Sequence, residues 1–295
     1  MQLLQQILNG LVIGLIYSLI ALGYTMVFGV LGFINFAHGE VYMIGAFIGL
    51  VLITSCGFSF VGALIGAMVL TAVMGMFIEY VAYRPVRRFG KGFMDAMLVS
   101  AIGVSMFLQN FAQLVWGTET HPLGLDIGKN VYELGGLLFS QQQLLITAIA
   151  LGLMVVLQIL VNKTVLGMAI RATSQDMVAA RLMGIGVNHI ISITFGIGSA
   201  LAAAGGLLVG AYFDAIYPLM GATAGIKAFT AAVLGGIGSI PGAMVGGIII
   251  GIVETLGAVY VSSAFRDGFA FLVLVLTLLF LPSGLFRVQR GEGKV

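Results

Sequence analysis

Residues 6–30, QILNGLVIGLIYSLIALGYTMVFGV, contain no charged side chain. A helix needs about 20 consecutive, mainly apolar residues to cross the hydrocarbon core of a bilayer. Further apolar runs lie near 38–54, 60–83, 94–116, 141–161, 190–213, 225–238, 242–261 and 268–285. Of the 295 residues, 60% are hydrophobic and 8% are charged, whereas a soluble domain carries about 25% charged residues. We therefore predict a single all-α domain over 1–295, a polytopic transmembrane bundle of about eight to ten helices.

Two of the apolar runs are interrupted by glycine and polar residues, at 29–40 (GVLGFINFAHGE) and at 234–242 (LGGIGSIPG). Non-helical backbone at membrane depth is tolerated where protein buries it or where it lines a wet cavity. One interruption in each half of a chain is typical of transporters built from two repeats. We expect two broken or re-entrant segments. The residues in them that we predict to line a translocation path are Asn35, His38, Glu40, Gly235, Gly236, Gly238 and Pro241.

The polar cluster in the first interruption has a competing interpretation. Asn35, His38 and Glu40 also suit a role as caps of two half-helices, or a position at the membrane surface. An ionisable group at membrane depth is costly and is by default a candidate for function. The sequence leaves both interpretations open.

The charges outside the apolar runs are sorted by sign. Basic residues dominate in 84–91, in 162–189 and in the tail after Pro282, whereas acidic residues dominate in the loop 117–139. Cytoplasmic loops of membrane proteins carry an excess of Lys and Arg. This rule places the three basic segments and the C-terminus in the cytoplasm. It places the loop 117–139 and the N-terminus outside, with nine crossings between the two ends.

The most polar of these segments, residues 167–184, reads GMAIRATSQDMVAARLMG. Thr173 and Asp176 have the three-residue spacing of a capping box, and Gly184 and Gly186 are typical helix stops. The pattern predicts a water-exposed helix of roughly ten residues, which is too short to be stable alone. We therefore expect this helix to dock on a soluble partner.

The sequence contains no motif for catalysis. It has no phosphate-binding loop, no nucleophile elbow and no zinc-protease helix. Its three histidines, His38, His121 and His189, are not at ligand spacing, so we expect no metal, and we expect no cofactor and no nucleic-acid partner. The energy for transport then comes from an ion gradient or from another subunit. Lys227 and Glu254 lie in the apolar C-terminal half, which leaves proton coupling open.

Several long stretches resemble one known family. They are INFAHGEVYMIGAF (34–47), YRPVR (83–87), SAIGVSMFLQN (100–110), GMAIRATSQDMVAARLMGI (167–185) and KAFTAAVLGGIGSIPGAMVGG (227–247). In this order they are similar to the LivH-type permeases of branched-chain amino-acid ABC importers. The resemblance covers essentially the whole chain and is weakest in 117–140.

The resemblance implies a multi-pass subunit of the bacterial inner membrane. Its partners would be a homologous, LivM-like permease, two cytoplasmic ABC ATPases and a periplasmic binding protein that delivers leucine, isoleucine or valine. The segment 167–186 would couple the chain to an ATPase. The residues that carry this coupling role by resemblance are Arg171, Ala172, Asp176, Ala179, Ala180 and Gly184.

Three other functions remain as alternatives. A permease of urea or amide importers resembles the chain around INFAHGE (34–40). An ion-coupled secondary transporter would need buried carboxylates, for which Glu40 and Glu254 are the candidates. A passive channel lacks a recognisable selectivity filter and leaves the helix in 167–184 unexplained.

Overall fold

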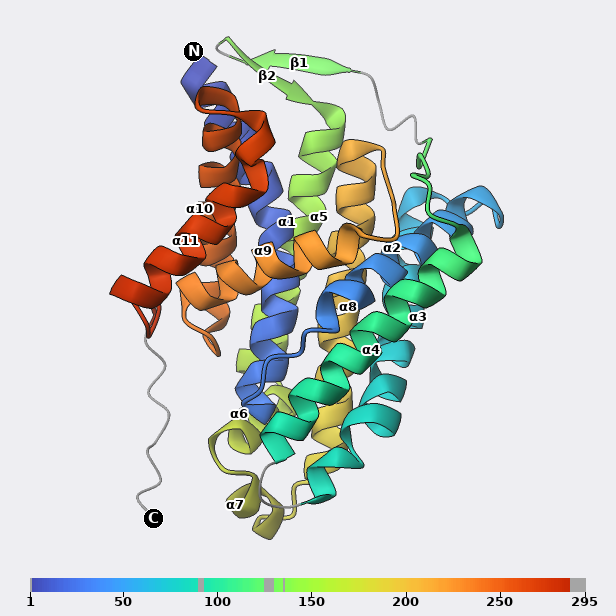
Figure 1. The fold of residues 1–295 in the computed structure, drawn as a ribbon, viewed down its shortest axis with the longest axis vertical. Helices are drawn as coiled ribbons and strands as arrows, with labels where there is room; N and C mark the ends of the chain where they lie inside the picture. Colours follow the sequence, from blue (N-terminus) through green and yellow to red (C-terminus); the bar gives the residue numbers. More distant parts are fainter. Residues whose placement is uncertain (1, 90–92, 125–129, 135, 287–295) are drawn as a thin grey trace.

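The computed structural model describes residues 2–89, 93–124, 130–134 and 136–286. This part of the chain forms eleven α-helices and one two-stranded antiparallel sheet (Figure 1). The helices are α1 (Gln2–Leu31), α2 (His38–Thr54), α3 (Phe60–Ile78), α4 (Phe93–Trp116), α5 (Gln141–Lys163), α6 (Val165–Gln175), α7 (Met177–Leu182), α8 (Val187–Phe213), α9 (Met220–Gly235), α10 (Ile240–Tyr260) and α11 (Arg266–Phe280). The strands are β1 (Val131–Leu134) and β2 (Leu137–Ser140).

Seven of the described helical segments are long and apolar enough to cross a membrane. They are α1, α3 with the π-helical turn Glu79–Tyr83 that continues it, α4, α5, α8, α10, and α11 with the 3₁₀ turn Ser263–Phe265 before it. The helices α2 and α9 are shorter. Both predicted interruptions are breaks next to these short helices, because 32–37 separates α1 from α2 and 236–239 separates α9 from α10. The predicted bundle with two broken segments is confirmed.

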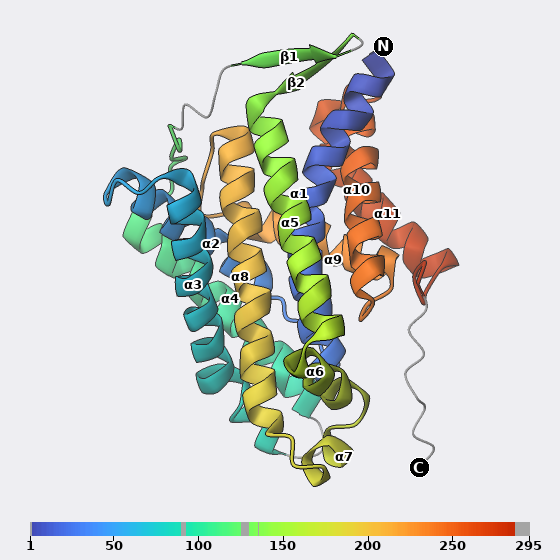
Figure 2. The same ribbon diagram turned by 180° about the vertical axis from the view of Figure 1, so that it is seen from behind.

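The helices α1 and α8 form the centre of the bundle. Most of each is buried inside the protein, whereas α4 and α11 bury little of their surface. In Figure 1, α9 runs across the front of the upright helices, with α11 on one side of it and α2 and α4 on the other. From behind, α5, α8 and α3 cover the opposite face (Figure 2). The helices on the outside keep apolar side chains exposed, as expected for contact with lipid or with another subunit.

Glycine lets α1 and α10 touch backbone to backbone. A Cβ atom on Gly14 would lie 2.7 Å from the Cα of Ile248, and one on Gly10 would lie 2.8 Å from the Cα of Ile252. The Ser18 hydroxyl spans the same interface and donates to the carbonyl of Met244 at 2.7 Å. Between helices in lipid, apolar burial gives little advantage, so close van der Waals packing and hydrogen bonds hold them together.

The two ends of the molecule differ in charge, as the sequence predicts. The basic residues Arg84 and Arg87 lie at the end that carries α6 and α7, where the Arg87 Nη2 contacts the Asn188 Oδ1 at 3.3 Å. The sheet lies at the opposite end and carries Glu133 (Figure 1). The loop 117–139 was not expected to contain strands. Lys91 and the charged residues of the tail lie outside the described residues.

We predict that Gly14→Leu destabilises the bundle by at least about 1–3 kcal/mol, the usual cost of overpacking, because the added side chain would meet the backbone of α10. The measurement is the midpoint of thermal denaturation of the purified protein in detergent. Gly152→Leu in α5 is the matched control, since no atom of a neighbouring helix lies within 4 Å of a Cβ at this exposed position. Equal midpoints for the two variants would contradict the prediction.

Candidate coupling groove and membrane cavities

The helices α6 and α7 form an elbow at the end of the molecule opposite the sheet (Figure 1). Thr164 caps α6, because its hydroxyl oxygen accepts a hydrogen bond from the Gly167 amide at 3.0 Å. Asp176 separates the two helices with extended backbone (φ −153°, ψ 110°). Its carboxylate accepts hydrogen bonds from the amides of Val178 and Ala179 at 2.7 and 2.9 Å. Asp176 is therefore the N-cap of α7.

The predicted helix start at Thr173 is wrong. Thr173 lies inside α6, and its hydroxyl donates to the carbonyl of Ala169 at 2.8 Å. The cap at Thr164 begins a helix earlier than predicted, so Val165–Gln175 is already helical when the chain reaches Asp176. The Asp176 side chain then starts a second, short helix instead of completing a capping box.

The predicted helix stop at Gly184 is confirmed. Gly184 has a φ of +85°, a conformation that costs glycine little. Its amide donates to the carbonyl of Arg181 at 3.1 Å, and the Ile185 amide donates to the carbonyl of Ala180 at 3.0 Å. This pair of bonds is the Schellman motif that ends many helices. The chain then enters α8 at Val187.

An apolar groove of about 420 Å³ lies in the elbow. The residues that line it are Val165, Met168, Ala169, Ala172, Gln175, Asp176, Ala179, Ala180, Met183 and Ile185. The predicted coupling residues among them are Ala172, Asp176, Ala179 and Ala180. Arg171 instead donates to the carbonyl of Val161 in α5, and Gly184 forms the turn after α7. Both of these residues therefore hold the elbow in place.

The rim of this groove is apolar and open. Val165 is 81% exposed and Met183 is 83% exposed, while the alanines of α6 and α7 leave room between them. The elbow is not part of any of the seven candidate membrane spans of the described chain. Exposed apolar patches on a water-facing surface indicate contact with another protein, and a groove of this kind accepts a short helix or a protruding side chain.

The side chains of the first interruption have different surroundings. The Oδ1 atom of Asn35 accepts hydrogen bonds from the Tyr83 hydroxyl at 2.7 Å and from the Ala37 amide at 3.2 Å. Asn35 therefore fixes the turn before α2, but it does not cap the helix as the capping interpretation expects, because no side chain caps the start of α2. His38 is buried, with its ring edge-on to that of Tyr24 at 4.6 Å between centroids. Its Nε2 makes no hydrogen bond to any described residue.

Glu40 lines a cavity of about 180 Å³ between α2 and α9. The residue is 3% exposed, and its Oε2 has no hydrogen-bond partner in the part of the chain that the structure describes. The carboxylate lies in the first turn of α2, where the helix dipole favours a negative charge. Gly221 and Gly225 of α9 and Ser105 of α4 line the same cavity. Glu40 thus faces a cavity between helices, and its place in a translocation path stays a prediction.

The residues predicted from the second interruption, Gly235, Gly236, Gly238 and Pro241, do not line either membrane cavity described here. Gly236 and Gly238 each have a φ of +99° and make the turn between α9 and α10. The Phe286 amide donates to the carbonyl of Gly235 at 3.0 Å, which ties the chain after α11 to this turn. Pro241 lies in the first turn of α10, where no amide donor is needed. These contacts form a turn, and a role in transport stays a prediction.

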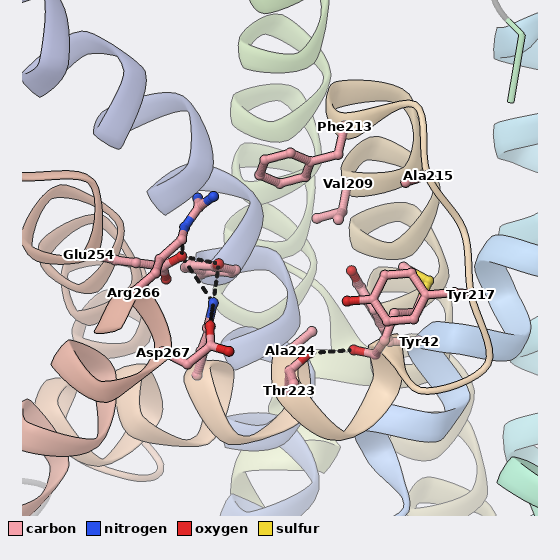
Figure 3. A pocket seen from close by; sticks show the side chains of 13 residues that line it. Tyr42, Val209, Phe213, Ala215, Tyr217, Thr223, Ala224, Glu254, Arg266 and Asp267 are labelled. Carbon is pink, nitrogen blue, oxygen red and sulfur yellow. Dashed lines mark hydrogen bonds and ion pairs between the residues drawn. The ribbon is translucent and has the colours of Figure 1, made fainter. Parts of the chain in front are cut away.

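A larger cavity of about 440 Å³ borders α9 beside the segment that follows α8 (Figure 3). Its lining residues are Tyr17, Tyr42, Val209, Phe213, Ala215, Tyr217, Met220, Thr223, Ala224, Lys227, Glu254, Arg266 and Asp267. Four of these are charged and come from α9, α10 and the start of α11. The translocation-path residues predicted from the sequence include none of the thirteen.

The four charged side chains form one connected cluster. Glu254 is fully buried, and its Oε1 lies 3.0 Å from the Lys227 Nζ, 2.5 Å from the Arg266 Nε and 3.2 Å from the Tyr17 Oη. The Lys227 Nζ also lies 2.7 Å from the Asp267 Oδ1. The cluster therefore contains two cations and two carboxylates. Buried charges are tolerated when they are paired and hydrogen-bonded in this way.

Sequence reasoning singled out Lys227 and Glu254 separately but missed the cluster. An ionisable residue in an apolar helix needs a partner, so the sequence could have indicated that Lys227 and Glu254 pair with each other. The two residues meet because α9 and α10 pack against each other after the turn at 236–239. Arg266 and Asp267 were not predicted as site residues, because they lie just before the last predicted span at 268–285 and charged residues are common at the ends of spans.

Comparison of the sequence with known proteins identifies its family. Residues 6–278 match the profile of a family described as "branched-chain amino acid transport system / permease component". The chain is 44% identical to the high-affinity branched-chain amino acid transport system permease protein LivH of Escherichia coli K12, over 96% of this chain and 94% of that protein. It is 43% identical to BraD of Pseudomonas aeruginosa, which has the same description, over 96% and 95%.

A more distant relative agrees with this assignment, and one solved structure shares the fold. The probable branched-chain amino acid transport permease protein LivH of Methanocaldococcus jannaschii is 29% identical, over 93% of this chain and 91% of that protein. A chain of PsaBC from Streptococcus pneumoniae, solved in complex with a Fab, superposes with a TM-score of 0.52 at 12% identity and covers 93% of this chain and 91% of its own. That likeness concerns the fold alone. The chain therefore belongs to the permease components of branched-chain amino acid transport systems, and it is a transport subunit rather than an enzyme.

Proposed function

We propose that the chain is one of two membrane subunits of an ATP-driven importer for leucine, isoleucine and valine. The observation that carries this proposal is the 44% identity to a branched-chain amino acid permease over 96% of the chain. That coverage includes the membrane cavities and the elbow. We further propose that two cytoplasmic ATPases drive the importer and that a periplasmic protein delivers the amino acid.

The elbow of α6 and α7 is the proposed docking site for an ATPase. Its groove has small side chains at its base, among them Ala172 and Ala179, and exposed apolar side chains at its rim. The elbow is held to α5 by Arg171 and continues into α8 after Gly186. A movement of the docked ATPase would therefore reach two membrane-spanning helices at once. Transitions of this rigid-body kind underlie many transport cycles.

The proposed orientation follows from charge. The end with the elbow and with Arg84 and Arg87 faces the cytoplasm, since cytoplasmic loops are rich in basic residues. The sheet end faces outward, where the binding protein would dock. In this orientation the larger cavity is the one nearer the outside and the groove lies in the cytoplasm (Figure 1, Figure 3).

The second membrane subunit, a homologous permease, is proposed to cover the face that contains α9. In Figure 1 this helix lies between α4 and α11, which are the spanning helices that bury the smallest share of their surface among those described. Ala222, Thr223 and Ile226 of α9 are exposed on this face, and each lines a cavity. A translocation path along this face needs a second surface to close it.

Two alternative functions differ from this proposal in measurable ways. A urea or amide importer would use the same ATPases with a different solute, and an ion-coupled transporter would need no ATPase. The carboxylates of Glu40 and Glu254 keep the second alternative chemically reasonable, because both are buried.

We expect the complete importer, reconstituted in vesicles with its binding protein, to accumulate leucine when ATP is present on the ATPase side and to continue when an ionophore collapses ion gradients. ATP hydrolysis then supplies the energy directly. Accumulation of radiolabelled leucine and urea is measured side by side. Uptake that stops with the ionophore, or that favours urea, would contradict the proposal.

We predict that Ala179→Trp uncouples the importer, because the indole would fill the groove that the ATPase enters. Leucine uptake should fall by at least roughly tenfold, since a misplaced bulky side chain at an interface easily costs 1.4 kcal/mol or more. The amount of permease in the membrane should not change, because Ala179 is exposed. Ala179→Ser is the matched control and should transport normally. Normal uptake by both variants would show that the groove is not the docking site.

A further inference from the structure

We propose that the 440 Å³ cavity beside α9 binds one amino acid in its zwitterionic form. The charged cluster receives the ammonium and carboxylate groups, and the apolar side chain lies against the end of α8. This inference deepens the proposed function and rests on it, because the importer supplies the amino acid that enters the cavity.

The cavity has one charged wall and one apolar wall. Figure 3 shows Glu254, Arg266 and Asp267 on one side, and Val209 and Phe213 of α8 with Tyr217 on the other. The volume of about 440 Å³ falls in the range of roughly 300–1,000 Å³ that is typical of small-molecule sites. A ligand that fits both walls is charged at one end and apolar at the other.

The charged wall is suited to a molecule that carries both charges. Lys227 and Arg266 balance Glu254 and Asp267, so the cluster has no formal net charge. A zwitterion adds one positive and one negative group and keeps this balance, whereas a simple cation or anion would leave a buried charge unpaired. An uncharged amide would separate these ion pairs without replacing them. The cluster therefore favours an amino acid over an inorganic ion or urea.

Glu254 and Arg266 can each form further hydrogen bonds to such a ligand. The Oε1 atom of Glu254 accepts three hydrogen bonds, while its buried Oε2 has no partner among the residues described. This oxygen can accept a bond from an ammonium group. Arg266 binds Glu254 through Nε, and its two terminal nitrogens, which make no hydrogen bond to the residues that the structure describes, can bind a carboxylate.

Arg266 also connects the two walls. Its guanidinium lies 5.2 Å from the centre of the Phe213 ring. A carboxylate bound to Arg266 would thus place the side chain of the amino acid next to Phe213 and Val209. The buried hydroxyl of Tyr42, which also has no hydrogen-bond partner in the described part of the chain, lines the same space. The apolar wall can select for branched aliphatic side chains by shape and burial.

The rim of the cavity is tied to the outward-facing loop. Asp214, directly after α8, accepts hydrogen bonds from the amides of Leu123 and Gly124, both at 2.9 Å. Ile216 pairs with His121 through two backbone hydrogen bonds of 2.8 and 2.9 Å. The loop 214–219 forms part of the cavity wall, so the cavity lies directly beneath the surface on which a delivering protein would dock.

The first test labels the cavity. Cys56 is the single cysteine of the chain, so Cys56→Ser provides a cysteine-free background. In that background Thr223→Cys places a thiol at an exposed position of α9 that lines the cavity. The reconstituted importer is treated with a water-soluble maleimide in the presence of leucine, leucinamide or 4-methylpentanoate. Leucinamide lacks the carboxylate, and 4-methylpentanoate lacks the ammonium group.

We expect leucine to slow the labelling at least roughly tenfold. The two analogues at equal concentration should have little effect, because each lacks one charged group and each lost charge-assisted hydrogen bond weakens binding by about tenfold or more. Ser263→Cys, exposed and outside the cavity, is the matched control and should label at the same rate in all conditions. Equal protection by all three compounds, or no protection by leucine, would each overturn the proposal.

The second test removes one charge of each sign. Lys227→Met with Glu254→Gln keeps the cluster neutral, and the two charged side chains that remain are not fully buried, since Arg266 is 32% exposed and Asp267 is 54% exposed. We expect this double variant to assemble and to lose roughly 10- to 100-fold in leucine uptake at limiting leucine. Wild-type uptake by the double variant would overturn the inference while leaving the proposed function intact. Failure of the wild-type importer to take up leucine would overturn the proposed function itself.

Discussion

The close approach of α1 to its neighbours is the constraint on which the bundle depends. In lipid an apolar side chain gains little by leaving the membrane for the protein interior, so helices associate through close packing and hydrogen bonds. Gly10 and Gly14 allow α1 to lie against the backbone of α10, and Gly205 of α8 packs against Ile20 of α1. With α1 buried at the centre, the remaining helices have a fixed scaffold around which to pack.

This scaffold lets two short helices end inside the protein. The chain leaves α1 at Leu31 and starts α2 at His38, and it leaves α9 at Gly235 and starts α10 at Ile240. Helix ends carry unsatisfied backbone groups that lipid cannot satisfy. The surrounding helices supply polar partners and leave cavities next to α9. Two of the sites with buried ionisable groups, at Glu40 and around Glu254, border this short helix.

The sequence predicted the architecture well because apolar length, glycine breaks and charge asymmetry are local properties. The two interruptions and the Gly184 stop could be read from neighbouring residues alone. The start of the elbow could not, because Thr164, Thr173 and Asp176 can each cap a helix and the choice depends on which helix begins first. The charged cavity escaped prediction for a different reason: its members come from three helices whose contacts are set by the tertiary structure.

The direct continuation of the elbow into α8 has a mechanical consequence. This helix runs unbroken from Val187 to Phe213, and at 1.5 Å per residue its 27 residues span roughly 40 Å. Its first residue, Val187, lies next to the groove in the elbow, and its last residue, Phe213, lines the apolar wall of the larger cavity. A tilt of only one degree about the Val187 end would displace Phe213 by roughly 0.7 Å, because the helix behaves as a stiff lever of that length. A few degrees of rocking suffice to reshape a space the size of one side chain.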